Sequence, residues 1–312
     1  MILRLAHVEI AGADLDASRA FYVDLLGFVE HARDEQSLYL RGAEEFDAWT
    51  LKVTRRDGGG LFHSAFRVGS ADDLDTLERT HADAGHALAR VPAGFEPHQG
   101  EALRVHTPDG HAIEFFHDFD EIDAYEDGRL LLPMRRAHGG VPPARLDHVS
   151  MRVDHVPTSL EYWRDVLDFS PSELWVDEND APRIAWLRRQ TRSHDVALGT
   201  HQGPAFHHVA YAVSDPTQLL RTADILGDAR LQGSLEFGPS RHGATNAFAM
   251  YIRDPDGNRL ELYTGDYTRD LDRPPLLWRP DDYARQGHSW WGDPPPQAFH
   301  ETRPLHQDGW PS

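Results

Sequence analysis

Three side chains in the second half of the sequence could together hold a metal ion. His148 begins one predicted strand, His208 lies in another, and Glu261 lies in the second strand of a predicted hairpin. Two imidazoles and one carboxylate form the ligand set of non-haem Fe(II) sites, which keep other coordination positions open. We favour His208 over the neighbouring His207 as the ligand, because small residues two and four positions further share its face of the strand and leave room.

A hairpin is expected to position Glu261. Its turn is DPDGN at residues 254–258, where Pro and Gly suit a tight turn between two β-favouring runs. Counting back along both strands places Tyr251 directly opposite Glu261, with their Cβ atoms about 5 Å apart. A phenol and a carboxylate would then share one wall of the site.

The elements that must position these residues recur along the chain. ARLDHVSMRV at 144–153 restates LRLAHVEI at 3–10, and YIRDPDGNRLELY at 251–263 restates RVHTPDGHAIEFF at 104–116. Helical and strand patterns between them follow the same order, which indicates an α+β fold of tandem βαβββ modules. We expect two barrel-like domains, residues 1–135 without the working metal site and the catalytic residues 144–267, with a linker within 127–143 and a tail at 268–312.

Composition excludes several classes of partner. The chain has 312 residues, a formal net charge of −20 and no cysteine. No basic surface is available for nucleic acid or an anionic membrane, and thiolate chemistry is excluded. Because we find neither an apolar signal segment nor a long apolar run, we expect a cytoplasmic protein.

Four stretches carry a resemblance to a known family. They are LDH at 146–148, AWLRRQTRSHD at 185–195, HHVAYA at 207–212 and GPSRHGATNAFAMYIRDPDGNRLELYTGDY at 238–267. Together they resemble type I extradiol catechol dioxygenases of the vicinal oxygen chelate (glyoxalase-like) superfamily, most strongly those acting on 3,4-dihydroxyphenylacetate (homoprotocatechuate). A weaker likeness extends over the first half and the tail. The resemblance implies cleavage of a catechol by O₂ to a muconic semialdehyde, commonly in a homotetramer.

The resemblance also implies roles for individual residues. His148, His208 and Glu261 would bind Fe(II), or Mn(II) as in some relatives. His194, His242 and Tyr251 fall on the family's acid–base positions, where an imidazole or a phenol can relay protons. The positions assigned to the substrate are Trp186, Ser150, Phe237, Arg241, His288 and Phe299.

The substrate positions depart from the family's pattern. Phe237 and His288 stand where the homoprotocatechuate enzymes carry arginines for the substrate's carboxylate, although Arg285 lies close to the second position. Ser150 stands where asparagine is usual. An anion without a guanidinium partner loses about 1.5–3 kcal/mol. We therefore expect a catechol with an apolar or small substituent to react at least as readily as 3,4-dihydroxyphenylacetate.

The first half contains a matching set, His7, His63 and Glu114. The same counting along the hairpin places Arg104 opposite Glu114, and a guanidinium there would oppose a divalent cation. We interpret this set as structural polar residues, although the sequence leaves a second metal site open.

The tail combines proline with aromatic residues and has no helical or strand periodicity. We expect a lid over the catalytic cavity that contributes Trp290, Trp291 or Phe299. A contact between subunits is the alternative.

Two other functions are compatible with this fold. A glyoxalase-like isomerase would need a carboxylate base at the metal, and a protein that merely sequesters a small molecule would need no metal ligands. Neither has a use for His194, His242 and Tyr251 together, so these residues favour the dioxygenase.

Overall fold

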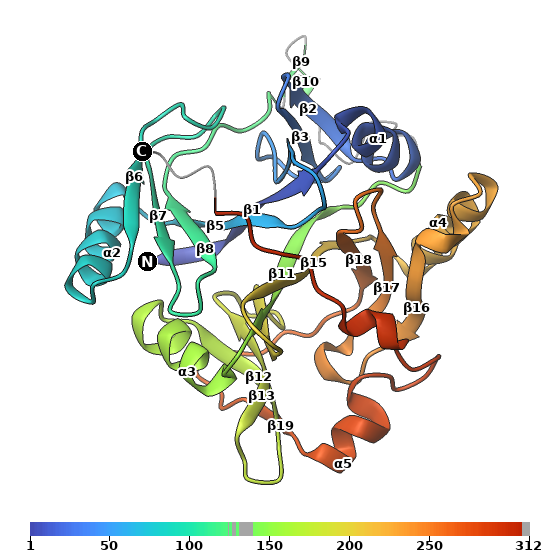
Figure 1. The fold of residues 1–312 in the computed structure, drawn as a ribbon. Coiled ribbons are helices and arrows are strands. Elements are labelled where there is room, and N and C mark those ends of the chain that lie inside the picture. The colour runs from blue at the N-terminus through green and yellow to red at the C-terminus, as the bar shows by residue number, and fades with distance from the viewer. Residues whose placement is uncertain (124, 127–128, 131–139, 308–312) are drawn as a thin grey trace.

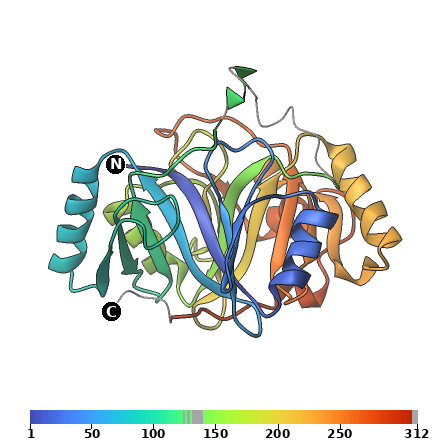
Figure 2. The ribbon, with the colours of Figure 1, turned by 90° about the horizontal axis from the view of Figure 1, so that it is seen from above.

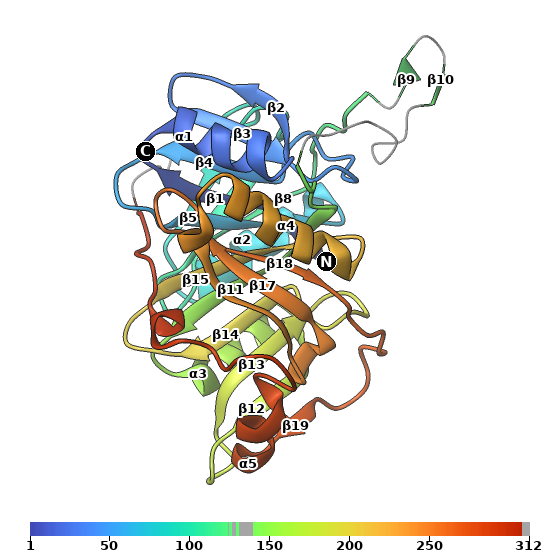
Figure 3. The same cartoon turned by 90° about the vertical axis from the view of Figure 1, so that its right-hand side faces the viewer.

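Each half of the chain forms one mixed sheet, and the two halves lie one above the other (Figure 3). The structure is a computed structural model that describes residues 1–123, 125–126, 129–130 and 140–307. Residues 127–128 and 131–139 of the predicted linker lie outside this part. None of the helices described is long and apolar enough to cross a membrane.

The first half contains β1 (Ile2–Gly12), α1 (Leu15–Arg19), η1 (Ala20–Leu25), β2 (Val29–Arg33), β3 (Ser37–Arg41), β4 (Leu51–Arg55), β5 (Leu61–Val68), α2 (Ala71–Asp83), β6 (Leu88–Val91), β7 (Ala102–His106) and β8 (Ala112–Phe116). Two short strands follow, β9 (Tyr125–Glu126) and β10 (Arg129–Leu130). Figure 1 shows this half in blue and teal.

The second half contains β11 (Arg145–Val153), α3 (Val156–Glu161), η3 (Tyr162–Val166), β12 (Ser170–Val176), β13 (Pro182–Arg188), β14 (Val196–Thr200), β15 (Ala205–Ala212), α4 (Pro216–Asp228), η4 (Gln232–Ser234), β16 (Leu235–Arg241), η5 (Ala244–Asn246), β17 (Phe248–Arg253) and β18 (Arg259–Thr264). The tail adds β19 (Leu276–Trp278), α5 (Pro280–Asp282), η6 (Tyr283–Gly287) and η7 (Gln297–His300).

The strand order repeats the same module four times. In each half, the first strand of a module pairs in parallel with the last strand of that module, and the two modules join through antiparallel first strands. The order is β2-β3-β4-β1-β5-β8-β7-β6 in one sheet and β16-β17-β18-β15-β11-β14-β13-β12-β19 in the other. Helices α2 and α4 lie at opposite sides of the strands (Figure 2). The predicted α+β fold of tandem βαβββ modules is confirmed.

A shared aromatic core joins the two halves. Phe66 of β5 packs against Trp163 and Phe169 of the second half, with 5.7 Å between ring centroids in each pair. Phe28 likewise meets Tyr211 at 4.7 Å. All five rings are almost completely buried, so the two domains share a packed core between them.

The turn of the catalytic hairpin is held by the first half. The Asn258 side chain donates to the Ala11 carbonyl at 2.8 Å and accepts from the Gly60 N–H at 2.7 Å. Asp254 accepts a hydrogen bond from the Tyr22 hydroxyl at 2.9 Å. Because β17 and β18 leave this turn in fixed register, the first half determines where the hairpin's side chains lie.

The tail packs against the second half. Strand β19 extends the sheet beside β12. The buried Arg259 pairs with Glu236 and donates to the carbonyls of Ala298 and Glu301. The tail therefore forms short elements despite its lack of periodicity, because neighbouring strands supply their hydrogen bonds.

Replacing Asn258 with Ala should lower the free energy of unfolding by about 2–4 kcal/mol, because the Ala11 carbonyl and the Gly60 N–H would stay buried without partners. Urea denaturation followed by tryptophan fluorescence measures the change. Asn179→Ala, in an exposed turn, is the matched control and should change stability by less than about 0.5 kcal/mol. Equal stability of the two variants would contradict the role given to Asn258.

Candidate metal centre and active site

Three neighbouring strands bring the predicted ligands together. His148 comes from β11, His208 from β15 and Glu261 from β18, and all three are buried. The Nε2 atoms of the histidines lie 3.2 Å apart, and Glu261 Oε2 lies 3.2 Å from His148 Nε2 and 3.1 Å from His208 Nε2. Tyr251 is paired with Glu261 across β17 and β18, as the turn predicted.

A hydrogen-bond chain fixes the tautomer of His208. His207 Nε2 donates to the Phe299 carbonyl at 2.8 Å, which leaves His207 Nδ1 as an acceptor. His208 Nδ1 lies 2.6 Å from it and must be the donor. His208 Nε2 therefore faces Glu261 with a free lone pair, as a metal ligand requires.

His148 is oriented in the same way by an acid. Its Nδ1 donates to Asp147 Oδ2 at 2.9 Å, and Asp147 in turn is paired with Arg192. Burial would raise the pKa of Asp147, but Arg192 and the hydrogen bond from His148 hold it well below its usual range. The acid stays ionised and directs His148 Nε2 toward the other two ligand atoms.

The donor set fits a divalent cation. Burial alone would lower the pKa of His148, but hydrogen bonds to Asp147 and Glu261 raise it to about 9. Burial lowers the pKa of His208 to about 4, despite Glu261. Three ligand atoms thus converge on one point, and in the metal-free protein at neutral pH a proton on His148 Nε2 faces Glu261. Fe(II) or Mn(II) would replace that proton.

The three predicted acid–base residues surround this centre. The His194 ring lies 3.9 Å from the His148 ring, centroid to centroid, and its Nδ1 is 3.0 Å from Ser193 Oγ. His242 donates from Nδ1 to the His288 carbonyl, and its Nε2 lies 3.1 Å from the Tyr251 hydroxyl.

Their pKa values keep all three neutral. Burial, followed by the nearby His148, lowers the pKa of His194 well below its ordinary value, and burial also lowers the pKa of His242. Burial and the Glu261 carboxylate raise the pKa of Tyr251 well above 10. At neutral pH, Tyr251 can donate a proton and His242 can accept one.

One cavity contains the triad and the acid–base residues. Of the positions assigned to the substrate, Ser150, Trp186, His288 and Phe299 line it. Phe237 and Arg241 are not among the residues that line this cavity. Phe237 stacks behind Tyr251, and Arg241 donates to the Asn246 carbonyl and lies over Phe248.

Of the three residues predicted as alternatives for the lid, Phe299 lines the cavity, whereas Trp290 and Trp291 are 63% and 52% exposed. The substrate wall does contain a guanidinium, although neither predicted position supplies it. Arg285 is exposed and paired with Asp282, but Arg152 of β11 lines the cavity.

Sequence reasoning missed several functional neighbours. His207 controls the tautomer of His208, and Arg152 and Tyr283 line the cavity. Arg152 could have been found, because it follows His148 by four residues on a strand and therefore lies on the same face. Tyr283 had no such signal, since it reaches the cavity from the tail.

Comparisons with known proteins agree with this geometry. Residues 145–262 match the family model described as Glyoxalase/Bleomycin resistance protein/Dioxygenase superfamily, and residues 61–119 match the catechol 2,3-dioxygenase-like N-terminal domain. A metapyrocatechase of Geobacillus stearothermophilus is 30% identical over 96% of this chain and 92% of its own. A manganese-dependent 2,3-dihydroxybiphenyl 1,2-dioxygenase of Geobacillus genomosp. 3 is 29% identical over 93% and 94%.

A solved structure extends the likeness to three dimensions. The homoprotocatechuate 2,3-dioxygenase from Brevibacterium fuscum, in complex with 3,4-dihydroxyphenylacetate, is 35% identical with a TM-score of 0.89, over 97% of this chain and 93% of that chain. The chain belongs to the extradiol dioxygenases of the vicinal oxygen chelate type. Its reaction is extradiol ring cleavage of a catechol, which makes it an oxidoreductase.

This assignment favours the dioxygenase over the glyoxalase-like isomerase and the sequestering protein that the fold also allowed. An isomerase of the glyoxalase type would need a carboxylate base at the metal. Among the described residues, Glu261 is the only carboxylate that lines the extradiol dioxygenase's cavity, and it belongs to the ligand triad.

The matching set in the first half of this extradiol dioxygenase has a different charge balance. His7 Nε2 lies 3.3 Å from His63 Nε2 and 3.5 Å from Glu114 Oε1. However, Glu114 already accepts from Arg104 at 2.5 Å and from Gln99 at 2.7 Å.

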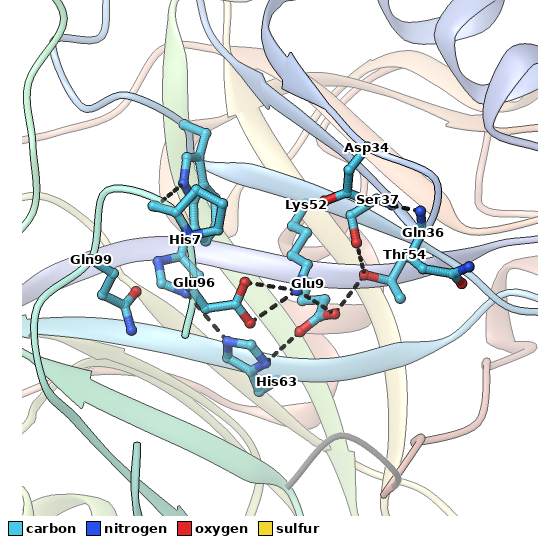
Figure 4. Close-up of polar contacts among 12 residues, drawn as sticks. His7, Glu9, Asp34, Gln36, Ser37, Lys52, Thr54, His63, Glu96 and Gln99 are labelled. Carbon is cyan, nitrogen blue, oxygen red and sulfur yellow. Dashed lines mark hydrogen bonds and ion pairs between the residues drawn. The ribbon is translucent and has the colours of Figure 1, made fainter. Parts of the chain in front are cut away.

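The surrounding charges are compensated as well. Figure 4 shows Lys52 between Glu9 and Glu96, while His63 contacts Glu9. A metal ion would have to compete with the Arg104 guanidinium for Glu114. This network supports our prediction that the first set has a structural role.

Metal analysis of variants separates the two sets in this extradiol dioxygenase. We expect about one Mn(II) or Fe(II) per chain, its loss in His208→Ala, and its retention in His63→Ala, because the first set is compensated by Arg104. Elemental analysis after anaerobic reconstitution and desalting measures the content. Two equivalents per wild-type chain, or equal losses in the two variants, would contradict this assignment.

Proposed function

We propose that this extradiol dioxygenase cleaves 3,4-dihydroxyphenylacetate or a related substituted catechol with O₂, giving a muconic semialdehyde. In this proposal His148, His208 and Glu261 hold Fe(II) or Mn(II), and His194, His242 and Tyr251 move protons. One observation carries it: three ligand atoms converge in a cavity that also contains three neutral proton-transfer groups, and both ligand histidines are oriented by a hydrogen bond at their second nitrogen.

His242 and Tyr251 are suited to the hydroxyl groups of the substrate. A metal held by three protein ligands would supply a Lewis acid with positions for a diol and O₂. The His242 tautomer presents Nε2 as an acceptor, so it can take a proton from the diol. Tyr251 remains a phenol and can donate to a substrate oxygen.

His194 is suited to the oxygen side. Its ring lies against that of the ligand His148, and its buried environment keeps it neutral. A neutral imidazole can deliver a proton from one nitrogen and be reprotonated at the other. We therefore assign it to assistance of O₂ activation and to proton delivery.

Aromatic walls would restrict water. Trp186 and Tyr283 lie on one wall, with 6.3 Å between their ring centroids, and Phe299 lies beside Tyr251 at 4.7 Å. These rings offer flat surfaces for an aromatic substrate. Because they would exclude water, they would also strengthen the polar interactions inside the cavity.

The proposal is tested with the full chain reconstituted with Fe(II) and, separately, Mn(II). We expect O₂ uptake and a yellow semialdehyde product with catechol, 4-methylcatechol or 3,4-dihydroxyphenylacetate. His194→Phe should bind metal normally but lower kcat by about 10²–10⁴-fold, because a proton-transfer group is lost.

Unchanged turnover in His194→Phe, with normal metal content, would remove that role. Absence of oxidation of every diol by the iron-loaded and the manganese-loaded wild type would refute the proposed function itself. His155→Phe is a matched control, since His155 caps helix α3 at an exposed position, and it should retain wild-type turnover.

We further propose a cytoplasmic homotetramer, as the family resemblance implied. Leu276 and Leu277 of β19, together with Trp290 and Trp291, are large exposed apolar side chains in the tail and are candidates for the subunit contact. Light scattering should give four times the mass of one chain. A monomer at micromolar concentration would contradict this assembly.

A further inference from the structure

A positively charged side chain in the cavity has no part in the functions described so far. Arg152 lies on β11, two residues beyond Ser150 and four beyond His148. Alternation along the strand puts these three side chains on one face, and all three line the cavity. Four residues of strand separate the Cα atoms of His148 and Arg152 by roughly 13 Å, so the two side chains enter the same space from different points along β11.

The guanidinium has no acidic partner. The hydrogen bond that the structure gives it runs from Nη1 to Ser150 Oγ at 3.2 Å. Within the part of the chain that the structure describes, no Asp or Glu pairs with it, and its charged neighbour is another cation, Arg259. Burial and Arg259 lower the pKa of Arg152 to about 10, so it still carries its charge at neutral pH.

Other buried arginines of this half are compensated. Arg259 is paired with Glu236, Arg192 with Asp147, and Arg188 donates to backbone carbonyls of the tail. Arg152 is partly buried, and a charge withdrawn from water without a partner is costly, which makes its guanidinium a candidate for pairing with a charged ligand.

The neighbouring strand makes room for this side chain. Gly199 of β14 is the register partner of Arg152. A Cβ atom at position 199 would lie 2.6 Å from Arg152 Nη1, so a larger residue there would displace the guanidinium from its present position. Gly199 thus provides the room that the charged group occupies at the cavity wall.

We propose that Arg152 binds a carboxylate on the substrate, attached to the side of the catechol ring remote from its two hydroxyl groups. The diol would lie at the triad and the carboxylate at Arg152. This inference rests on the proposed function and narrows its substrate to 4-substituted catechols with an anionic group. From the sequence we expected a catechol with an apolar or small substituent to react at least as readily as 3,4-dihydroxyphenylacetate. Arg152 reverses this expected order of substrates, because it supplies a guanidinium from β11 that the positions of Phe237 and His288 do not.

Steady-state kinetics of Arg152→Met with two substrates test the inference. We expect KM for 3,4-dihydroxyphenylacetate to rise by about 10-fold to 100-fold with little change in kcat, because a charge-assisted pair remote from the reacting atoms is lost. For 4-methylcatechol, KM should change by less than about 3-fold. Arg152→Lys, which keeps the charge, should lie between wild type and Arg152→Met for the anionic substrate.

Two controls keep the result interpretable. Arg164→Met removes an exposed arginine paired with Asp165 and should behave as wild type with both substrates. Anaerobic calorimetry with manganese-loaded protein measures the dissociation constant of 3,4-dihydroxyphenylacetate without turnover. It should rise in Arg152→Met by the same factor as KM, with metal content unchanged.

The outcomes separate this inference from the proposed function. Equal effects of Arg152→Met on both substrates, or no effect on either, would overturn the role of Arg152 while ring cleavage stands. If the wild type oxidises no diol, the proposed function fails. The calorimetric comparison then still decides the inference: selective loss of 3,4-dihydroxyphenylacetate binding supports Arg152 as the anion site, and unchanged binding overturns it.

Discussion

The convergence of three lone-pair donors on one point is the constraint on which this protein depends. Such an arrangement is unfavourable unless a cation lies among the donors, and the chain stabilises it from outside. Asp147 and His207 each form a hydrogen bond with the second nitrogen of a ligand histidine, so that both rings keep Nε2 directed at the site. The ligand strands, Asp147 of β11 and the tail carbonyl that binds His207 thus act together on a single small volume.

The two halves show how one scaffold supports two electrostatic outcomes. Both place two histidines and a glutamate at equivalent strand positions. Opposite the glutamate, the first half has Arg104 and the second half has Tyr251, both in the same hairpin register. A guanidinium neutralises the carboxylate permanently, whereas a phenol leaves its charge available for a metal ion. A single cross-strand pair therefore distinguishes a packed polar core from a reactive site.

Local patterns predicted most of the fold and the triad. The turn at 254–258 fixed the register of β17 and β18, and with it the pairing of Tyr251 and Glu261. Repetition of the module gave the equivalent positions of His148 and His208. These features depend on neighbours close in sequence, which periodicity and turn chemistry describe well.

Contacts distant in sequence could not be predicted in the same way. Trp290 and Trp291 have the composition of a lid, but they are exposed, while Tyr283 reaches the cavity wall from η6. Charged residues on strands are usually assigned to solvent, so Arg152 was overlooked. Its guanidinium occupies the space that a Cβ atom at position 199 would fill, a relation between two strands that only the register reveals.

The bond from His207 to the Phe299 carbonyl has a consequence for biosynthesis. Every ligand is already present when β18 leaves the ribosome, yet the proton arrangement of His208 is settled only after residue 299 has been translated and has folded back. Binding of the metal by His208 in its final tautomer thus comes late in the synthesis of the chain. A translation product that stops before η7 would retain the ligands but lose control over which nitrogen meets the ion.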